Sequence, residues 1–204
     1  MHKTHHGESI IIASNNAGKV REINALLAEE EIHVIPQDAL GVLEARETGL
    51  SFVENAILKA RNAAAHSGLA AIADDSGIEV DVLGGAPGIY SARYAGPDAS
   101  DQDNLNKLIE VLRDIAPRER TARFQCLMVY MRHAEDPTPV ICQGTWEGLI
   151  LDAPRGENGF GYDPIFFVPS EGCSSAELDP ATKNRLSHRG QALSKLVRYL
   201  RGEG

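Results

Sequence analysis

The chain has 204 residues, of which 43% are hydrophobic and 24% charged, and its formal net charge is −9. This composition is ordinary for a globular protein, and the length allows a substantial core. The acidic balance without a basic stripe argues against a nucleic-acid polymer as partner. No apolar run approaches the roughly 20 residues that a membrane span needs.

The three cysteines, Cys126, Cys142 and Cys173, are odd in number and far apart, which fits neither a disulfide framework nor a zinc spacing. A reducing cytoplasm is the simplest setting for them. The His-rich residues 1–8 are expected to form a disordered N-terminal extension, and residues 9–204 a single domain.

In the first half of the chain, hydrophobic periodicity predicts a strand, a helix, a strand, a helix and a strand, at residues 10–13, 20–31, 32–35, 51–66 and 69–73. Ser51 and Glu54 match a capping box at the start of the second helix, and Gly68 stops it. The last of these strands is expected to be brief and to end at Asp74.

The second half begins with a helix that Ser100 caps. Residues 121–132 and 139–151 predict a long hairpin, and residues 164–168 a further strand. Asp179 and Pro180 open a short helix, and the last helix is expected over residues 190–201. This mixture predicts an α/β protein with a mixed sheet.

A polar stretch joins the first strand to the first helix: Ser14-Asn15-Asn16-Ala17-Gly18-Lys19. The first N–H groups of a helix lack internal partners, and the peptide dipoles add about half a positive charge there, so this turn is a candidate phosphate site. It is not a Walker A loop, because Ala13 and Val20 stand where that motif needs Gly and Ser or Thr. A plain helix cap is the alternative.

The run Asp74-Asp75-Ser76-Gly77 follows a predicted buried strand, where open α/β sheets present ligand-binding residues. Adjacent side chains of an extended segment point oppositely, so one aspartate is expected to face the site. Glu44 or Glu47 is a candidate to share a magnesium ion with Asp75, since Mg²⁺ needs few carboxylates beside water and phosphate oxygens. The alternatives are a capped turn and a solvated charge at Glu47.

On the helix that follows Ser51, three polar residues are spaced i, i+4 and i+7: Asn55, Lys59 and Asn62. Residues at these spacings share one face of a helix. Lys59 is a candidate to reach a phosphate, and a solvated helix face is the alternative.

The run Gly159-Phe160-Gly161-Tyr162-Asp163 holds aromatic residues between glycines. Such aromatics can stack on a base while the backbone closes in, and Asp163 can accept hydrogen bonds from a base or ribose. The competing interpretation is a β-bulge whose aromatics fill the core. Further donors stand near the last helix at Lys183 and in Ser187-His188-Arg189-Gly190, with a capping or core role for His188 as the alternative.

Five motifs occur here in the order seen in one known family: Ser14 to Lys19, Ala73 to Gly77, Gly84-Gly85-Ala86-Pro87-Gly88-Ile89-Tyr90-Ser91-Ala92-Arg93, Gly159 to Pro164 and Ser187-His188-Arg189. In these motifs the chain resembles the non-canonical purine nucleoside triphosphate pyrophosphatases, which are the inosine/xanthosine triphosphate pyrophosphatases, and in particular the bacterial dITP/XTP type. The resemblance covers about Ser9 to Arg201. Arg46 departs from the pattern, because relatives of this type often carry an acid there.

The resemblance implies an elongated two-lobed α/β fold with a long central mixed sheet flanked by helices and an active cleft between the lobes. It implies a cytoplasmic homodimer. The implied activity is Mg²⁺-dependent hydrolysis of ITP, dITP and XTP to the monophosphate and pyrophosphate, which cleanses the nucleotide pool.

Carried over by position, the resemblance also assigns site residues. Glu47 and Asp75 hold the metal, and Asp75 is the proton acceptor, with Ser76 beside it. The triphosphate is held by Ser14, Asn15, Asn16, Ala17, Gly18 and Lys19, with help from Lys59. The nucleoside is surrounded by Phe160, Gly161, Tyr162, Asp163, Lys183, His188 and Arg189.

Donors from His188 or Arg189 would suit the 6-oxygen of hypoxanthine and xanthine and would oppose the amino group of adenine. Two other classes stay open from the residues alone, a nucleotide sensor that does not hydrolyse and an enzyme that cuts the terminal phosphate. A sensor would have little need for acids at both Glu47 and Asp75. Whether water attacks the α- or the β-phosphorus is also open.

Overall fold

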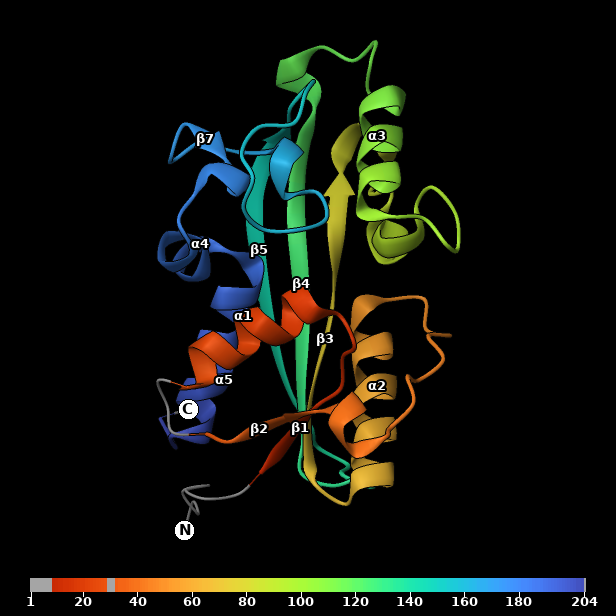
Figure 1. Ribbon diagram of the computed structural model, residues 1–204, viewed down its shortest axis with the longest axis vertical. Helices are drawn as coiled ribbons and strands as arrows, with labels where there is room; N and C mark the ends of the chain where they lie inside the picture. The colour runs from red at the N-terminus through yellow and green to blue at the C-terminus, as the bar shows by residue number, and fades with distance from the viewer. Residues whose placement is uncertain (1–8, 29–31, 204) are drawn as a thin grey trace. The chain divides into compact units, whose positions relative to one another are not determined.

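The computed structural model describes residues 9–28 and 32–203 (Figure 1). The expected extension at residues 1–8 and the predicted end of the first helix at residues 29–31 lie outside them. The chain divides into two compact units. Unit 1 comprises Met1–Asp75, Cys126–Gly144 and Arg189–Gly204, and unit 2 comprises Ser76–Gln125 and Thr145–His188.

The described strands form one mixed sheet in the order β2-β1-β3-β4-β5-β6-β7. β1 pairs in parallel with β2 and β3, and β6 pairs antiparallel with β5 and β7. The strands are β1 (Ile10–Ile12), β2 (Val34–Pro36), β3 (Ala70–Val80), β4 (Thr121–Met131), β5 (Val140–Ile150), β6 (Phe166–Val168) and β7 (Cys173–Ser174). The α-helices are α1 (Ala17–Ala28), α2 (Phe52–Ser67), α3 (Asp101–Val111), α4 (Pro180–Leu186) and α5 (His188–Leu200). The predicted α/β class with a mixed sheet is confirmed.

The prediction that the third strand ends before Asp74 was wrong, because β3 runs on to Val80. Asp and Ser favour turns when their side chains bond their own backbone. Here the charges of Asp74 and Asp75 are met by cations from other elements, Lys19 and Lys59 respectively. The strand can therefore continue through two acidic residues.

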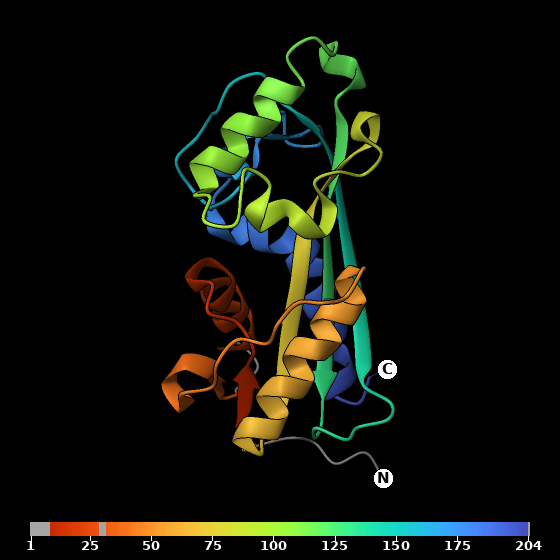
Figure 2. The same ribbon diagram turned by 90° about the vertical axis from the view of Figure 1, so that its right-hand side faces the viewer.

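In unit 1, helices cover both faces of the sheet (Figures 1 and 2). Successive side chains of a strand point to opposite faces. Ile10 and Ile12 of β1 accordingly pack in a cluster with residues of α1 and α5. Ile11 and Ala13 pack in a second cluster with residues of α2. All four are at most 1% exposed, so this strand is buried on both faces, and its sequence is accordingly apolar without alternation.

Helix α2 begins and ends where local chemistry predicts. The Ser51 side chain accepts a hydrogen bond from Glu54 N, and Gly68 follows the helix with φ of 71°. The buried face of α2 consists largely of alanine, at positions 56, 60, 63 and 64. Small side chains let the helix lie close to the sheet, so this layer tolerates little extra volume.

Unit 2 has a core of its own. Leu105, Leu108 and Leu112 pack in one cluster with side chains of β3, β4, β5 and β6. The helix that carries the first two leucines, α3, begins at a complete capping box between Ser100 and Asp103. The predicted cap was therefore correct, and it orients an amphipathic helix onto the sheet.

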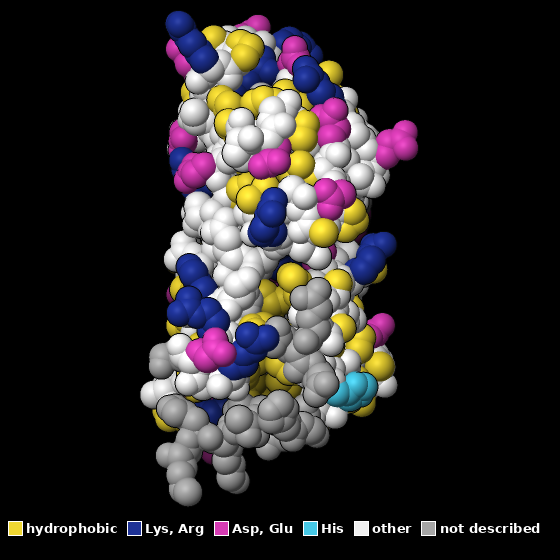
Figure 3. Space-filling model, turned by 90° about the vertical axis from the view of Figure 1, so that its left-hand side faces the viewer, with side chains coloured by type: hydrophobic (Ala, Val, Ile, Leu, Met, Phe, Trp, Pro, Cys, Tyr) yellow, Lys and Arg dark blue, Asp and Glu magenta, His cyan; other side chains and the backbone are white. Residues whose placement is uncertain are grey.

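None of the described helices is long and apolar enough to cross a membrane. On the face that Figure 3 draws, basic and acidic side chains are interspersed over the described residues. That mixture agrees with the absence of a basic stripe in the sequence.

We expect Ala60→Leu to lower the free energy of unfolding by about 1–3 kcal/mol, because Ala60 is fully buried and extra methylenes overpack a filled layer. Ala65→Leu is the matched control, since Ala65 is exposed on the same helix and its change should stay within about 0.5 kcal/mol. Urea unfolding measures both. Equal effects would contradict the tight packing of α2.

Candidate active site

The polar stretch from Ser14 to Lys19 comprises the connection between β1 and α1 and the first three residues of α1, and several of its groups hydrogen-bond within the stretch. The Asn16 side chain accepts a hydrogen bond from Lys19 N at 3.0 Å, as a helix cap does. Ser14 Oγ accepts from Asn16 N at 3.2 Å, and Asn15 Oδ1 accepts from Gln37 Nε2 at 2.9 Å. The cap interpretation is thus correct for Asn16, and a phosphate role for the turn stays a prediction.

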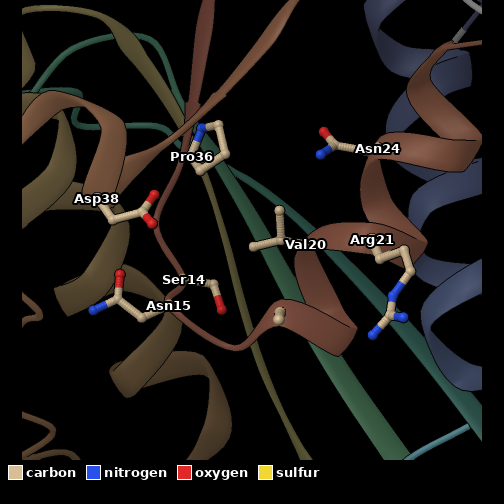
Figure 4. Close-up of a pocket in the computed structure, with 8 residues that line it drawn as sticks. Ser14, Asn15, Val20, Arg21, Asn24, Pro36 and Asp38 are labelled. Atoms are coloured by element: carbon tan, nitrogen blue, oxygen red, sulfur yellow. The ribbon is translucent and has the colours of Figure 1, made fainter.

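A cavity of about 380 Å³ borders this turn (Figure 4). Its walls come from the turn itself, from α1, and from the end of β2 with the residues that follow it. The lining residues are Ser14, Asn15, Ala17, Val20, Arg21, Asn24, Pro36 and Asp38. The predicted phosphate turn therefore has open space beside it.

Asp74 joins the start of α1 to the start of α5. Its side chain is fully buried. It accepts from Lys19 Nζ at 2.5 Å, from Arg189 Nε at 2.8 Å and from the Cys126 thiol at 3.1 Å. Arg189 Nη1 also donates to Glu22 at 2.5 Å. These contacts fix two predicted substrate residues, Lys19 and Arg189, to one strand.

The charge of Asp74 is held by its neighbours. Burial alone would raise the pKa of Asp74, but the Arg189 guanidinium and the Lys19 ammonium hold it well below its usual range. A buried carboxylate in this state is a fixed anion. Asp74 is therefore suited to orienting cations and unsuited to accepting a proton.

On the other side of β3, Asp75 meets a different cation. Lys59 Nζ of α2 lies 2.6 Å from Asp75 Oδ1 and 3.0 Å from Glu47 Oε1. Adjacent residues of a strand point to opposite faces, so Asp74 bonds residues of α1 and α5 while Asp75 bonds a residue of α2. The expectation that the two aspartates diverge is met by these contacts, and Lys59 brings the predicted metal pair together.

The pKa of Asp75 moves in the opposite direction from that of Asp74. Burial raises the pKa of Asp75 above its usual value, and the Glu47 carboxylate adds to the rise, while Lys59 and Lys19 oppose it. Burial alone would lower the pKa of Lys59, but Asp75 and Glu47 raise it. Asp75 is thus the more basic of the two aspartates.

The donor set suits a magnesium ion. Mg²⁺ takes oxygen ligands and uses one or two protein carboxylates, with waters and substrate phosphates completing its shell. Glu47 and Asp75 supply two such carboxylates, and they lie close together because both bond Lys59 Nζ. Among the described residues, no group of three or more His, Cys, Asp or Glu side chains could hold a metal. Two carboxylates fit an ion whose other ligands are waters and phosphate oxygens.

Lys19 lies near Asp75, since it bonds the adjacent residue, Asp74, and its charge opposes the rise in the pKa of Asp75. The sheet register explains this proximity. Ile12, the last residue of β1, pairs with Ile72, so β1 turns into the polar stretch as β3 continues to Asp74 and Asp75. Ser76 is the next residue of β3 and is half-buried, at the start of unit 2.

In unit 2, Asp163 gathers the predicted nucleoside residues. Its carboxylate accepts from Lys183 Nζ at 2.6 Å, Ser175 Oγ at 2.9 Å and Phe160 N at 2.9 Å. The Lys183 ammonium lies 5.2 Å from the centroid of the Phe160 ring. A side chain at Gly159 would begin 2.2 Å from Asp163 Oδ2, so the glycine allows this close approach.

The two aromatic residues of this segment differ. Tyr162 is buried in the unit 2 core, and its hydroxyl donates to Ser91 O at 2.8 Å. Burial raises the pKa of Tyr162. Phe160 is half-buried, and the next residue, Gly161, donates its N–H to Asp101 at 2.8 Å. The core interpretation is therefore correct for Tyr162, while Phe160 keeps surface for a ligand.

His188 is buried and stacks on Phe124, with ring centroids 4.7 Å apart and planes 11° apart. It also lies 6.5 Å from the Trp146 ring in a stacked arrangement. His188 begins α5, two residues before the predicted start. The ring is therefore held in a fixed plane by aromatic neighbours.

The sequence did not reveal the contacts that three residues make in this site: Asp74, Glu22 and Cys126. The partners of Asp74 are 55 and 115 residues away in the chain, which local patterns do not reveal. One signal was present for Glu22, because residues three apart on a helix are neighbours and Glu22 stands three after Lys19.

We expect Asp74→Asn to lower the free energy of unfolding at pH 7 by about 3–5 kcal/mol, because it leaves a buried guanidinium without one of its acids. The folded pKa of Asp74 lies below the unfolded value of about 3.9. The difference in the free energy of unfolding between wild type and the variant should therefore have its full value above that pH and decrease as the pH falls. Urea unfolding from pH 7 downward measures it.

Asp81→Asn is the control, since the Asp81 side chain is 44% exposed in its pair with Arg123. Exposed pairs contribute under about 1 kcal/mol. Similar losses for both variants would show that burial of Asp74 is not what matters.

Comparison with known proteins gives a consistent picture along nearly the whole chain. The sequence model of the Ham1 family matches residues 10–199. A dITP/XTP pyrophosphatase of Escherichia coli is 60% identical over 194 residues, which covers 95% of this chain and 98% of the relative. A dITP/XTP pyrophosphatase of Vibrio cholerae is 60% identical over 193 residues, with 95% and 96% covered.

Solved structures agree in fold. A HAM1 protein from Coxiella burnetii superposes with a TM-score of 0.88 at 49% identity, covering 96% of this chain and 99% of that one. The Ham1 protein of Staphylococcus aureus gives a TM-score of 0.83 at 41% identity, covering 97% and 100%.

Proposed function

Because this chain belongs to the Ham1 family, we propose that it hydrolyses non-canonical purine nucleoside triphosphates, such as dITP, XTP and ITP, to the monophosphate and pyrophosphate. One observation carries the proposal for this chain's own residues. Lys59 bonds both Glu47 and Asp75, and Lys19 at the start of α1 bonds Asp74, the residue next to Asp75. Acids for a metal and a cationic phosphate turn are what cleavage of a phosphoric anhydride needs.

In unit 1, we assign the triphosphate to the stretch from Ser14 to Lys19, which forms the β1–α1 connection and the start of α1. Lys19 supplies a cation and the helix start supplies N–H groups, which together favour a phosphate. Lys59, which bonds both acids in this structure, would supply a second cation for the phosphates. Asp74 holds Lys19 in position by accepting a hydrogen bond from its ammonium group.

We assign the metal, Mg²⁺, to Glu47 and Asp75. When bound, it offsets negative charge on the phosphate oxygens, which is a large part of catalysis in phosphoryl chemistry. Asp75 accepts the proton of the attacking water. A positioned base of this kind contributes about 10²–10⁴-fold.

In unit 2, we assign the nucleoside to Phe160, Gly161, Tyr162 and Asp163 with Lys183 and His188. Phe160 offers a half-buried ring for stacking, and Tyr162 supports the segment from the core. Donors at His188 and Arg189 suit a 6-oxygen on the purine. An amino group there would leave a buried donor unpaired, which costs about 1–3 kcal/mol.

We further infer a homodimer in the cytoplasm. Leu43 and Leu50 of unit 1 are 83% and 84% exposed, and burial in a second copy would remove this apolar surface from water. The three cysteines are free, which suits a reducing compartment.

We expect Asp75→Asn to lower kcat by at least about 10²-fold with the fold intact, because the amide cannot accept the proton. The fold should survive, since Asn has nearly the same shape as Asp and Lys59 keeps the Glu47 carboxylate as a partner. The measurement is pyrophosphate release from dITP with Mg²⁺. Glu44→Gln is the control. Glu44 lies in the same loop as Glu47, but among the described contacts Lys59 bonds Glu47 and Asp75, so this variant should have wild-type turnover.

The product of the same assay separates the other classes. Orthophosphate in place of pyrophosphate would mean cleavage of the terminal phosphate, and binding without either product would mean a sensor. Turnover near wild type in a folded Asp75→Asn protein would remove Asp75 from the proton-acceptor role.

We expect His188→Phe to lower the ratio of kcat/KM for ITP over ATP by about 10- to 100-fold, since the ring nitrogens that favour a 6-oxygen are lost. Phenylalanine keeps the stacking on Phe124, so the core stays filled. Steady-state kinetics with both nucleotides measures the ratio. An unchanged ratio would exclude His188 from base selection.

A further inference from the structure

Asn55, Lys59 and Asn62 form a polar stripe along one face of α2. This stripe contacts the loop of residues 41–50, which precedes the helix and carries Glu47. Four side chains of α2 hydrogen-bond this loop, and their order along the helix is the reverse of the loop's order. Asn62 Nδ2 donates to Leu43 O (2.8 Å), Lys59 Nζ donates to Glu47 Oε1 (3.0 Å), Asn55 Oδ1 accepts from Gly49 N (2.8 Å) and Glu54 Oε2 accepts from Leu50 N (2.9 Å).

The loop therefore runs antiparallel along one face of α2 and is fastened at both ends. Asn55 is fully buried, so this end of the stripe is not a solvated helix face. A Cβ atom at Gly49 would lie 2.8 Å from Asn55 Oδ1 and 2.6 Å from Glu54 Cβ. The loop backbone is thus pressed onto the helix at Gly49, two residues after Glu47.

Within a single copy of the chain, little apolar packing holds the loop. Val42 is buried, but every residue from 43 to 50 is half-buried or exposed. Little apolar burial means that polar contacts decide whether a segment stays in place. Two carboxylates also repel each other when they are brought together, so a loop without its fastenings would let the Glu47 carboxylate move into water.

We propose that Asn55 and Asn62 are positioning residues for Glu47: they clamp the 41–50 loop to α2 and so hold the Glu47 carboxylate against Lys59, opposite Asp75. Neither residue touches substrate in this role. The inference rests on the proposed function, because it takes Glu47 as a metal ligand. A positioning role accounts for Asn55 and Asn62, the two polar residues of the stripe for which the sequence offers no substrate contact.

The test combines amide hydrogen exchange with Mn²⁺ binding, followed by electron paramagnetic resonance, on the full chain. In Asn62→Ala, we expect faster exchange at residues 43–50 and a Mn²⁺ dissociation constant about 10-fold higher, as for other residues that orient metal ligands. Asn55→Ala should also expose the Gly49 amide directly. Asn62 is only half-buried, so its variant remains informative if the buried Asn55→Ala fails to fold.

Arg61→Ala is the matched control. Arg61 lies on the same helix and donates to Ala134 O at 3.0 Å, outside the 41–50 loop. It should leave both loop exchange and Mn²⁺ affinity as in wild type. A folded Asn62→Ala protein with wild-type Mn²⁺ affinity overturns the positioning role, whatever happens to exchange. Failure of the proposed function shows separately, as wild-type protein that releases no pyrophosphate from dITP.

Discussion

A carboxylate buried in a protein stays charged only if cations meet it, and Asp74 is the point where unit 1 satisfies this constraint. Lys19 comes from the start of α1 and Arg189 from the start of α5, and Cys126 donates from β4. One side chain of β3 thereby sets the positions of three other elements. Arg189 is further secured by Glu22 of α1. The start of α1 is thus attached to the sheet through a charge, in addition to apolar packing.

The neighbouring aspartate uses the same strand for a different purpose. The alternation of side chains along β3 sends Asp75 toward α2, where Lys59 is its partner. Cations lower the pKa of Asp74, while burial raises the pKa of Asp75. Two adjacent acids with opposite shifts are suited to different roles. The first orients cations, and the second is the one to which the proposed function gives the metal and the proton.

A lysine–carboxylate pair also organises unit 2. Asp163 accepts from Lys183, from Ser175 and from the backbone of Phe160, so its oxygens are largely engaged within the protein. Asp163 accordingly shapes the segment around Phe160. His188 has a comparable position, since the stack on Phe124 fixes the plane of its ring before any ligand arrives. Such preorganisation reduces what must be ordered on binding.

The sequence by itself determined the features that depend on neighbours a few residues away. The caps at Ser51, Ser100 and Asp179 and the stop at Gly68 were predictable because a cap and its partner lie within one turn. The motifs also led to the family. Only the tertiary structure decided that β3 continues through Asp74 and Asp75, that Tyr162 belongs to the core, and that Asn55 and Asn62 fasten a loop. Each of these depends on groups that are distant in the chain or on a loop without periodicity, and burial and charge compensation between such groups arise only when the chain has folded.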